Sequence, residues 1–217
     1  MCTDATAATP CPLQGKGRKR GFDIIRKPEL EGTSFLYNNV EVKYVGTCPE
    51  TGISLYCSIL HNYGVRVFPN GSKTLINAIG STSEGCRNVW DARRKQRYLH
   101  FAHAFGNHKQ ILVSHAVWMA AGRVIPPGMT MDHINGCTTD NRLGNLRCIS
   151  NAENNRDGGF LRKLRHKGID PVKIQRPYLL RYFDRMAEVK ATISRWRYTH
   201  LTRSDLLTIL YAPSLKW

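Results

Sequence analysis

The stretch of the chain that decides its fold is residues 129–157, MTMDHINGCTTDNRLGNLRCISNAENNRD. Its first part, Met129 to Ile134, is a short extended run between two turn signals, Pro-Pro-Gly at 126–128 and Asn-Gly at 135–136. Turn residues on both sides of such a run predict a strand. We therefore expect a strand that ends near Ile134.

A second strand and a helix are expected after the polar loop at residues 135–144. Leu146 to Ile149 alternates well enough to pair back on the first strand. Ser150 is followed three residues later by Glu153, the spacing of a capping box, in which the two side chains satisfy backbone donors at the start of a helix. The segment therefore predicts the order strand, loop, strand, helix.

Polar residues in this segment suit the hydrolysis of a phosphodiester, which needs an activated water and a cation on the phosphate oxygens. Asp132 offers a hard oxygen ligand, and His133 offers a neutral imidazole that can accept a proton from water. Asn154, in the first turn of the predicted helix, offers an amide oxygen. Proteins usually hold Mg²⁺ with a few of their own ligands and several waters. Neighbouring residues of a strand point to opposite faces, so Asp132 and His133 share a site only at a strand end or bulge.

These residues resemble the HNH endonucleases, in particular the Asp-His branch found in phage and intron-encoded nicking and homing enzymes. The resemblance covers about residues 115–155, and its specific parts are DHING, NRLGNLR and the Asn-rich turn that follows. It implies a ββα-metal motif in which Asp132 and Asn154 bind a divalent metal ion, most often Mg²⁺ with Mn²⁺ as the alternative. It also implies that His133 is the general base and that Asn145 holds the loop between the strands, in keeping with the local backbone bonds that loop Asn side chains usually make.

Two features of the resemblance leave alternatives open. Asn151, Asn154 and Asn155 are each placed to be the helix ligand, and spacing favours Asn154. His115 stands where the family often has a His at the start of the preceding helix, but Ala116 follows it where many relatives have Arg. His115 is therefore either a packing residue or a support for the catalytic residues.

The net charge indicates a polyanionic partner. The chain has 32 Lys and Arg against 16 Asp and Glu, a formal net charge of +16. Neutralising phosphates releases condensed counterions, so double-stranded DNA is the expected partner. No membrane segment and no obligate protein partner is evident in the sequence, and RNA is disfavoured because no strand carries base-stacking aromatic residues. The candidate phosphate contacts, for which a solvated surface is the alternative, are Arg93, Arg94, Lys95, Arg142, Arg147, Arg162, Lys163, Arg165 and Lys167.

Cysteine usage favours a reducing compartment. Seven cysteines are scattered along the chain with no C-x-x-C pair, which argues against a disulfide framework and against a zinc knuckle. The first residues lack the apolar core of a signal peptide. We therefore expect a protein of the cytoplasm, in a bacterial or phage-infected cell, that is not secreted.

The fold class expected is α+β, with four regions along the chain. Residues 1–30 form a basic, disordered arm, and residues 31–113 form a small antiparallel β region with Gly and Asn turns. Residues 114–160 hold the nuclease motif, and residues 161–217 form a basic helical region.

Three helices are expected besides the one at Ser150. The first runs from His115 to Ala121 with Ser114 as its cap, and the second follows the apolar spacing between residues 177 and 198. The third runs from residue 203 to 210 with Thr202 or Ser204 as its cap.

The function expected is a metal-dependent DNA endonuclease of HNH type, with the homing or nicking role of a phage or mobile element implied by the resemblance alone. The alternative is a non-catalytic DNA-binding protein that uses a degenerate HNH module as a scaffold. Salt-sensitive DNA binding without cleavage in metal-replete protein would favour the alternative.

Overall fold

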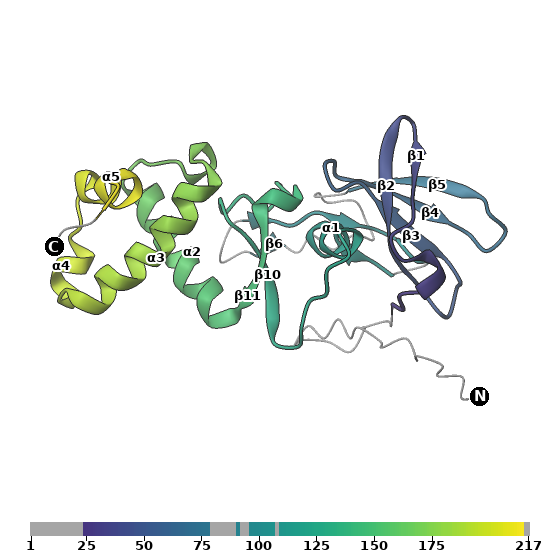
Figure 1. Cartoon of the computed structure of the whole chain (residues 1–217), viewed down its shortest axis with the longest axis horizontal. Helices are drawn as coiled ribbons and strands as arrows, with labels where there is room; N and C mark the ends of the chain where they lie inside the picture. Colours follow the sequence, from purple (N-terminus) through teal and green to yellow (C-terminus); the bar gives the residue numbers. More distant parts are fainter. Residues whose placement is uncertain (1–23, 79–89, 92–95, 107–108, 215–217) are drawn as a thin grey trace. The chain divides into compact units, whose positions relative to one another are not determined.

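The computed structural model describes residues 24–78, 90–91, 96–106 and 109–214 (Figure 1). These residues divide into two compact units. The first unit is built from the chain up to Pro127 together with Thr138–Leu146, and the second from Gly128–Cys137 together with the chain from Arg147 on. Strands dominate the first unit and helices the second, which makes the protein an α+β protein, as predicted.

The first unit contains a five-stranded antiparallel meander, in which each strand pairs with its neighbours along the chain. Its strands are β1 (Ser34–Tyr37), β2 (Val40–Thr47), β3 (Ser54–Cys57), β4 (Tyr63–Val67) and β5 (Lys73–Asn77). A two-residue turn joins β1 to β2, and both its residues, Asn38 and Asn39, have positive φ (50° and 63°). Such hairpin turns require positive φ, which Asn tolerates better than most residues.

Short strand pairs and one helix complete the first unit. They are β6 (Trp90–Asp91), β7 (Gln96–Arg97), β8 (His100–Phe101), β9 (Ile111–Leu112) and α1 (Val113–Ala120), with single 3₁₀ turns η1 (Pro28–Leu30) and η2 (Leu143–Asn145). β8 pairs with β9, and α1 packs on β2 and β3. The predicted cap of this helix was wrong: α1 begins at Val113 with Leu112 as its N-cap, and Ser114 is buried in the first turn.

Residues 24–30 fall in the predicted basic arm, yet they pack on the sheet, while residues 1–23 lie outside the described part of the chain. Ile25 bridges to Thr47, and Ile24 is buried where β2 is bulged between Tyr44 and Gly46. A Cβ atom at Gly46 would overlap the Ile24 side chain, so the close approach of the two backbones requires glycine there.

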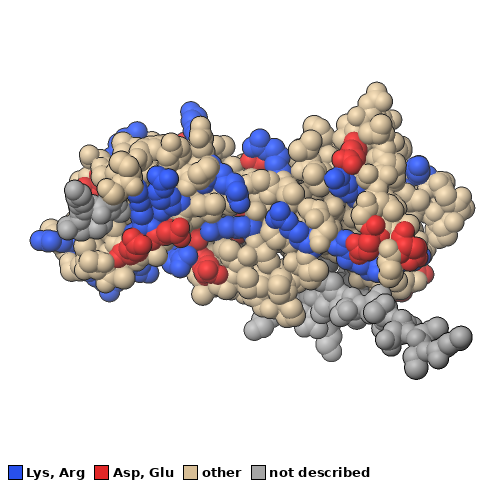
Figure 2. All heavy atoms as spheres, in the orientation of Figure 1, with Lys and Arg blue, Asp and Glu red and all other residues tan. Residues whose placement is uncertain are grey.

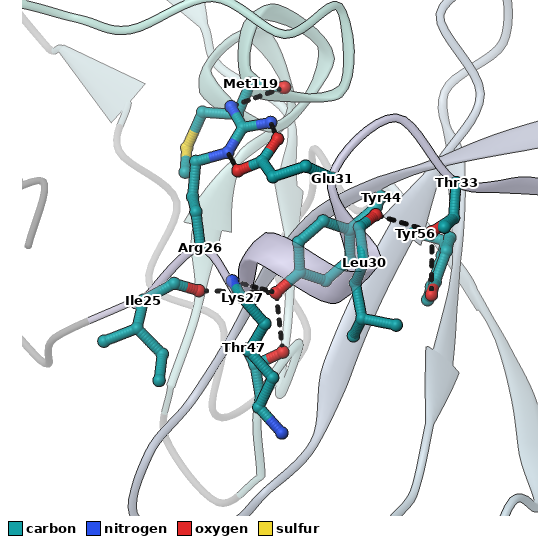
Figure 3. A network of polar contacts seen from close by, with 10 residues as sticks. All are labelled: Ile25, Arg26, Lys27, Leu30, Glu31, Thr33, Tyr44, Thr47, Tyr56 and Met119. Carbon is teal, nitrogen blue, oxygen red and sulfur yellow. Dashed lines mark hydrogen bonds and ion pairs between the residues drawn. The ribbon is translucent and has the colours of Figure 1, made fainter. Parts of the chain in front are cut away.

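A polar network fastens this N-terminal segment to the rest of the first unit (Figure 3). The Tyr44 hydroxyl accepts a hydrogen bond from the Lys27 backbone N–H (3.2 Å) and lies 2.8 Å from the Thr47 hydroxyl. Arg26 forms an ion pair with Glu31, and its Nη1 donates to the carbonyl oxygen of Met119 in α1 (3.1 Å). The segment is thereby bonded to both the sheet and the helix.

The second unit consists of a two-stranded sheet and four helices. Its elements are β10 (Met129–His133), β11 (Leu146–Ser150), α2 (Asn151–His166), η3 (Pro171–Lys173), α3 (Arg176–Thr192), α4 (Arg195–Thr199) and α5 (Arg203–Tyr211). The predicted order strand, loop, strand, helix is confirmed, with both hydrogen bonds of the capping box at Ser150 and Glu153. Buried side chains of α2, α3 and α5 form the core around Phe160, Tyr182 and Phe183.

The helical range predicted between residues 177 and 198 is two helices, not one. Ile193 and Ser194 are extended, and the Ser194 hydroxyl accepts a hydrogen bond from the Arg197 backbone N–H at the start of α4. A β-branched residue followed by Ser favours such a break, because Ser satisfies free backbone donors better than it continues a helix. The cap of α5 is Thr202, one of the two candidates, and it makes a capping box with Asp205.

No helix in the described ranges is long and apolar enough to cross a membrane.

Candidate active site

Two carboxylates of the second unit meet at one guanidinium group. Asp132 comes from β10, Arg147 from β11 and Asp157 from α2. Nη2 of Arg147 lies 2.7 Å from Oδ2 of Asp132 and 2.7 Å from Oδ2 of Asp157, and Nε of Arg147 donates to Asp132 Oδ2 at 2.8 Å. Nε of Arg156 donates to the other oxygen of Asp157 at 2.7 Å. Both carboxylates are therefore neutralised by arginine side chains.

This group is largely removed from solvent. The side chain of Asp157 is 1% exposed, that of Asp132 13% and that of Arg147 18%. Arg147 also lies over the ring of Phe183, with 4.6 Å from its guanidinium carbon to the ring centroid. Buried carboxylates this close repel one another unless a positive charge lies between them, and here the guanidinium supplies it.

The donor chemistry at this position fits a divalent metal ion. Two oxygens bound to one nitrogen are no further apart than two hydrogen-bond lengths, so Asp132 and Asp157 could both reach a hard cation at the place that Nη2 of Arg147 occupies. The described residues hold no group of three or more His, Cys, Asp or Glu side chains with metal-binding geometry, so amide oxygens or waters would complete the coordination.

Helix geometry separates the three asparagines that compete to be the helix ligand. Asn154 precedes Asp157 by three residues and lies on the same face of α2, whereas Asn155 is two residues away and faces elsewhere. Asn154 is half-buried, while Asn151 and Asn155 are exposed. Of the three, Asn154 is the one that shares a helix face with Asp157 and is partly buried, and its role as the helix ligand stays a prediction.

His133 is the last residue of β10, the kind of strand end at which neighbouring side chains can reach one site. It is 4% exposed, and its carbonyl oxygen accepts a hydrogen bond from the Gly136 backbone N–H at 2.7 Å. The Asn135 side chain accepts from the Cys137 backbone N–H at 2.8 Å. A tight turn thus begins directly after His133.

Arg165 of α2 holds this turn in place. Its Nη2 donates to the carbonyl oxygens of Gly136 (3.0 Å) and Asn135 (3.4 Å). Gly136 has φ +66°, and a Cβ atom there would lie 2.5 Å from Nη2 of Arg165 and 3.0 Å from Cδ1 of Leu161. The backbone angle therefore favours glycine, and a larger residue would also require the Arg165 and Leu161 side chains to move.

The remaining predicted residues of the loop and helix lie in the first unit. Asn145 donates to the carbonyl oxygen of Asp140 at 2.8 Å, which ties the loop to itself. Arg142 pairs with both carboxylate oxygens of Asp140, each at 2.8 Å, and its side chain is 68% exposed. Asn62 donates to the Thr139 carbonyl oxygen at 3.2 Å, and His115 is half-buried on α1.

Several arginines and lysines predicted to contact phosphate have partners within the protein. Besides Arg147 and Arg165, Lys163 donates to the Tyr198 carbonyl oxygen at 3.1 Å, and burial lowers its pKa. Arg162 is exposed and Lys167 half-buried. The candidates Arg93, Arg94 and Lys95 lie outside the described residues. Figure 2 shows Lys and Arg side chains gathered over the helical unit, with a smaller acidic group among them.

Burial raises the pKa of the thiol of Cys148, which lies beside Arg147 on β11. The four described cysteines are free thiols: Cys48, Cys57, Cys137 and Cys148.

Residues 112–156 match the family model described as HNH endonuclease. This segment is therefore similar to the HNH endonucleases. It covers α1, β10, the loop, β11 and the first turns of α2, about a fifth of the chain. No curated protein and no solved structure matches the chain.

The structure identifies two residues that sequence reasoning missed, Arg156 at the end of the matched segment and Asp157 directly after it. Asp157 follows the last matched residue, Arg156, which is its second ion-pair partner. The spacing of three residues from Asn154 was the signal that could have found Asp157, because it places both on one helix face.

Proposed function

We propose that this protein is a divalent-metal-dependent DNA endonuclease of HNH type. The observation that carries the proposal is the meeting of Asp132 and Asp157 at one guanidinium nitrogen, with Asn154 on the same helix face as Asp157. The family match of the segment supports a nuclease, and the net charge of +16 supports a DNA partner.

The residues present define distinct roles. Asp132, Asp157 and Asn154 would hold the cation, which when bound would neutralise charge on the phosphate and on the leaving 3′ oxygen. His133 would accept the proton of the attacking water at an imidazole nitrogen. Arg147, on leaving the carboxylates, would present its planar guanidinium to a phosphate, which it suits better than Lys because it bonds two oxygens at once.

The same geometry makes the binding of the metal ion and the binding of DNA depend on each other. The two carboxylates and the two arginines, Arg147 and Arg156, balance in charge, so a cation must displace a guanidinium before it gains both carboxylates. A phosphate that attracts Arg147 would remove the competitor. DNA and metal ion would therefore each strengthen the binding of the other.

We further propose that the enzyme nicks one strand, because one such site in a chain acts on one phosphodiester at a time. The phage or mobile-element role is proposed from the DHING and NRLGNLR motifs. A metal-replete protein that binds DNA and cuts nothing is the competing possibility, favoured by the internal balance of charges around Arg147.

The experiment is cleavage of supercoiled plasmid with Mg²⁺, with Mn²⁺ and with a chelator. We expect metal-dependent open-circle product from the wild type and none from His133→Ala or Asp132→Asn. The matched control is His166→Ala, an exposed histidine of α2, which should cut like the wild type. If the wild-type protein binds DNA in a salt-sensitive manner but cuts with neither ion, the nuclease proposal is wrong and the protein is a DNA-binding scaffold.

A further inference from the structure

A tryptophan stands exposed on a short helix of the second unit. Trp196 lies in α4 and is 67% exposed, far more than a tryptophan of a core. Its ring is nevertheless held: the imidazole of His200 stacks on it, with 4.7 Å between ring centroids and 27° between the planes. An ordered yet exposed indole has little rotational freedom to lose when a flat ligand binds it.

The backbone that carries this tryptophan is also fixed. The Thr199 hydroxyl donates to the Trp196 carbonyl oxygen at 2.7 Å, and Nδ1 of His200 lies 2.7 Å from the same oxygen. Lys163 of α2 donates to the Tyr198 carbonyl oxygen and lies over the Tyr198 ring, 4.7 Å from its centroid. α4 is therefore anchored to α2 on one side while Trp196 stays exposed.

The surroundings of the indole are cationic. Residues 189–204, the stretch of chain between Glu188 and Asp205, contain four Lys and Arg and no Asp or Glu. Arg203 is occupied with the carbonyl oxygens of Lys167 and Gly168. Arg195 and Arg197, on either side of Trp196, are exposed and form no ion pair within the described residues.

We propose that Trp196, Arg195 and Arg197 form a contact surface for an unpaired nucleic-acid strand, with a base stacked on the indole and phosphates on the guanidinium groups. Every base has a π face, and stacking on an aromatic ring beside a basic surface is how single strands are bound without sequence preference. In a duplex the base faces are covered by their neighbours, so an unpaired strand is the better fit. A protein partner is less suited, because two exposed arginines beside the indole, which have no ion pair among the described residues, favour a polyanion. The surface does not depend on the proposed cleavage.

The test measures binding of a fluorescein-labelled single strand and of a duplex of equal length to the full chain by anisotropy. Trp196→Ala should weaken binding of the single strand roughly 5- to 150-fold, the range of one lost base stack, and the duplex much less. Trp196→Phe should keep most of the affinity. The control is Tyr211→Ala, since Tyr211 is an aromatic residue of the same unit that is 48% exposed and should be neutral.

Salt dependence separates stacking from charge. Trp196→Ala should leave the slope of log K against log salt unchanged, whereas Arg195→Ala and Arg197→Ala should each lower its magnitude by about 0.7. Trp196→Ala that binds the single strand like Tyr211→Ala, or that loses affinity equally for both DNAs, would overturn the proposal. The binding assay requires no cleavage, so a failure of the cleavage proposal leaves this result readable.

Discussion

Replacing Arg147 by Met removes the positive charge between Asp132 and Asp157 while keeping a side chain of similar length over Phe183. Breaking a fully buried ion pair by removing one partner costs about 3–5 kcal/mol. Arg147 and Asp132 retain 18% and 13% side-chain exposure, and Asp157 keeps Arg156. We therefore expect Arg147→Met to lower the free energy of unfolding by about 2–3 kcal/mol in the absence of divalent ions.

Divalent ions should reverse this loss in the variant. With the guanidinium gone, a cation can take its place between the carboxylates, and a cation at about 100 times its dissociation constant stabilises the folded state by about 2.7 kcal/mol. The wild type should gain much less, because the ion must first displace Arg147. The assay is urea unfolding with a chelator and with millimolar Mg²⁺ or Mn²⁺.

The matched control is Arg162→Met, which alters an exposed arginine of α2 outside this group. It should change stability little and show the wild-type response to metal. Equal gains from metal in Arg147→Met and the wild type would refute the reasoning, because the guanidinium would then not compete for the site. An Arg147→Met variant as stable as the wild type in the chelator would refute the energetic estimate.

Three further outcomes follow from particular residues. Gly136→Ala should lower the free energy of unfolding by about 1–3 kcal/mol in urea, because a side chain at φ +66° is strained and meets Arg165; no change would mean that the turn can move away from α2. Burial lowers the pKa of His100, so the unfolded chain binds a proton at this residue more readily than the folded chain. The contribution of His100 to stability should therefore be complete above about pH 6.5 and be lost as the pH falls below that value. In a plot of the urea midpoint against pH, His100→Gln should show a smaller fall below about pH 6.5, and an unchanged slope would rule out His100 as its source. Hydrogen bonds from the Ser150 side chain and backbone lower the pKa of Glu153, so its contribution should be present above about pH 4.5 and be lost as pH falls below that; Glu153→Gln should show less acid dependence in thermal melts, and a variant that matches the wild type at every pH would contradict the capping role.

Features decided by neighbours in the chain could be predicted from the sequence. The capping box of Ser150 and Glu153 depends on four consecutive residues, and the strand end at His133 depends on the turn that follows it. The cap of α1 could not be predicted in this way. Ser114 is a good cap by residue type, but the helix begins two residues earlier than predicted, at Val113, where pairing of β9 with β8 brings the chain into the core.

The partners of the arginines could not be predicted either, because they depend on contacts between distant elements. Arg147 and Arg165 have the composition of phosphate contacts, yet one lies between two carboxylates and the other bonds a backbone turn. Asp157 escaped attention for the same reason. Its spacing of three residues from Asn154 places it on the same helix face, but its place opposite Asp132 arises only when α2 packs beside β10.

Ser150 is at once the last residue of β11 and the N-cap of α2, so no residue is spare between the strand that carries Arg147 and the helix that carries Asp157. Each residue of a helix advances by about 100° around its axis. A single insertion or deletion in the first two turns of α2 would therefore rotate Asp157 away from Asp132 without altering any motif residue. Homologous chains should tolerate many substitutions here but no change of length. The number of residues between Arg147 and Asp157 should therefore identify homologues better than the identity of those residues.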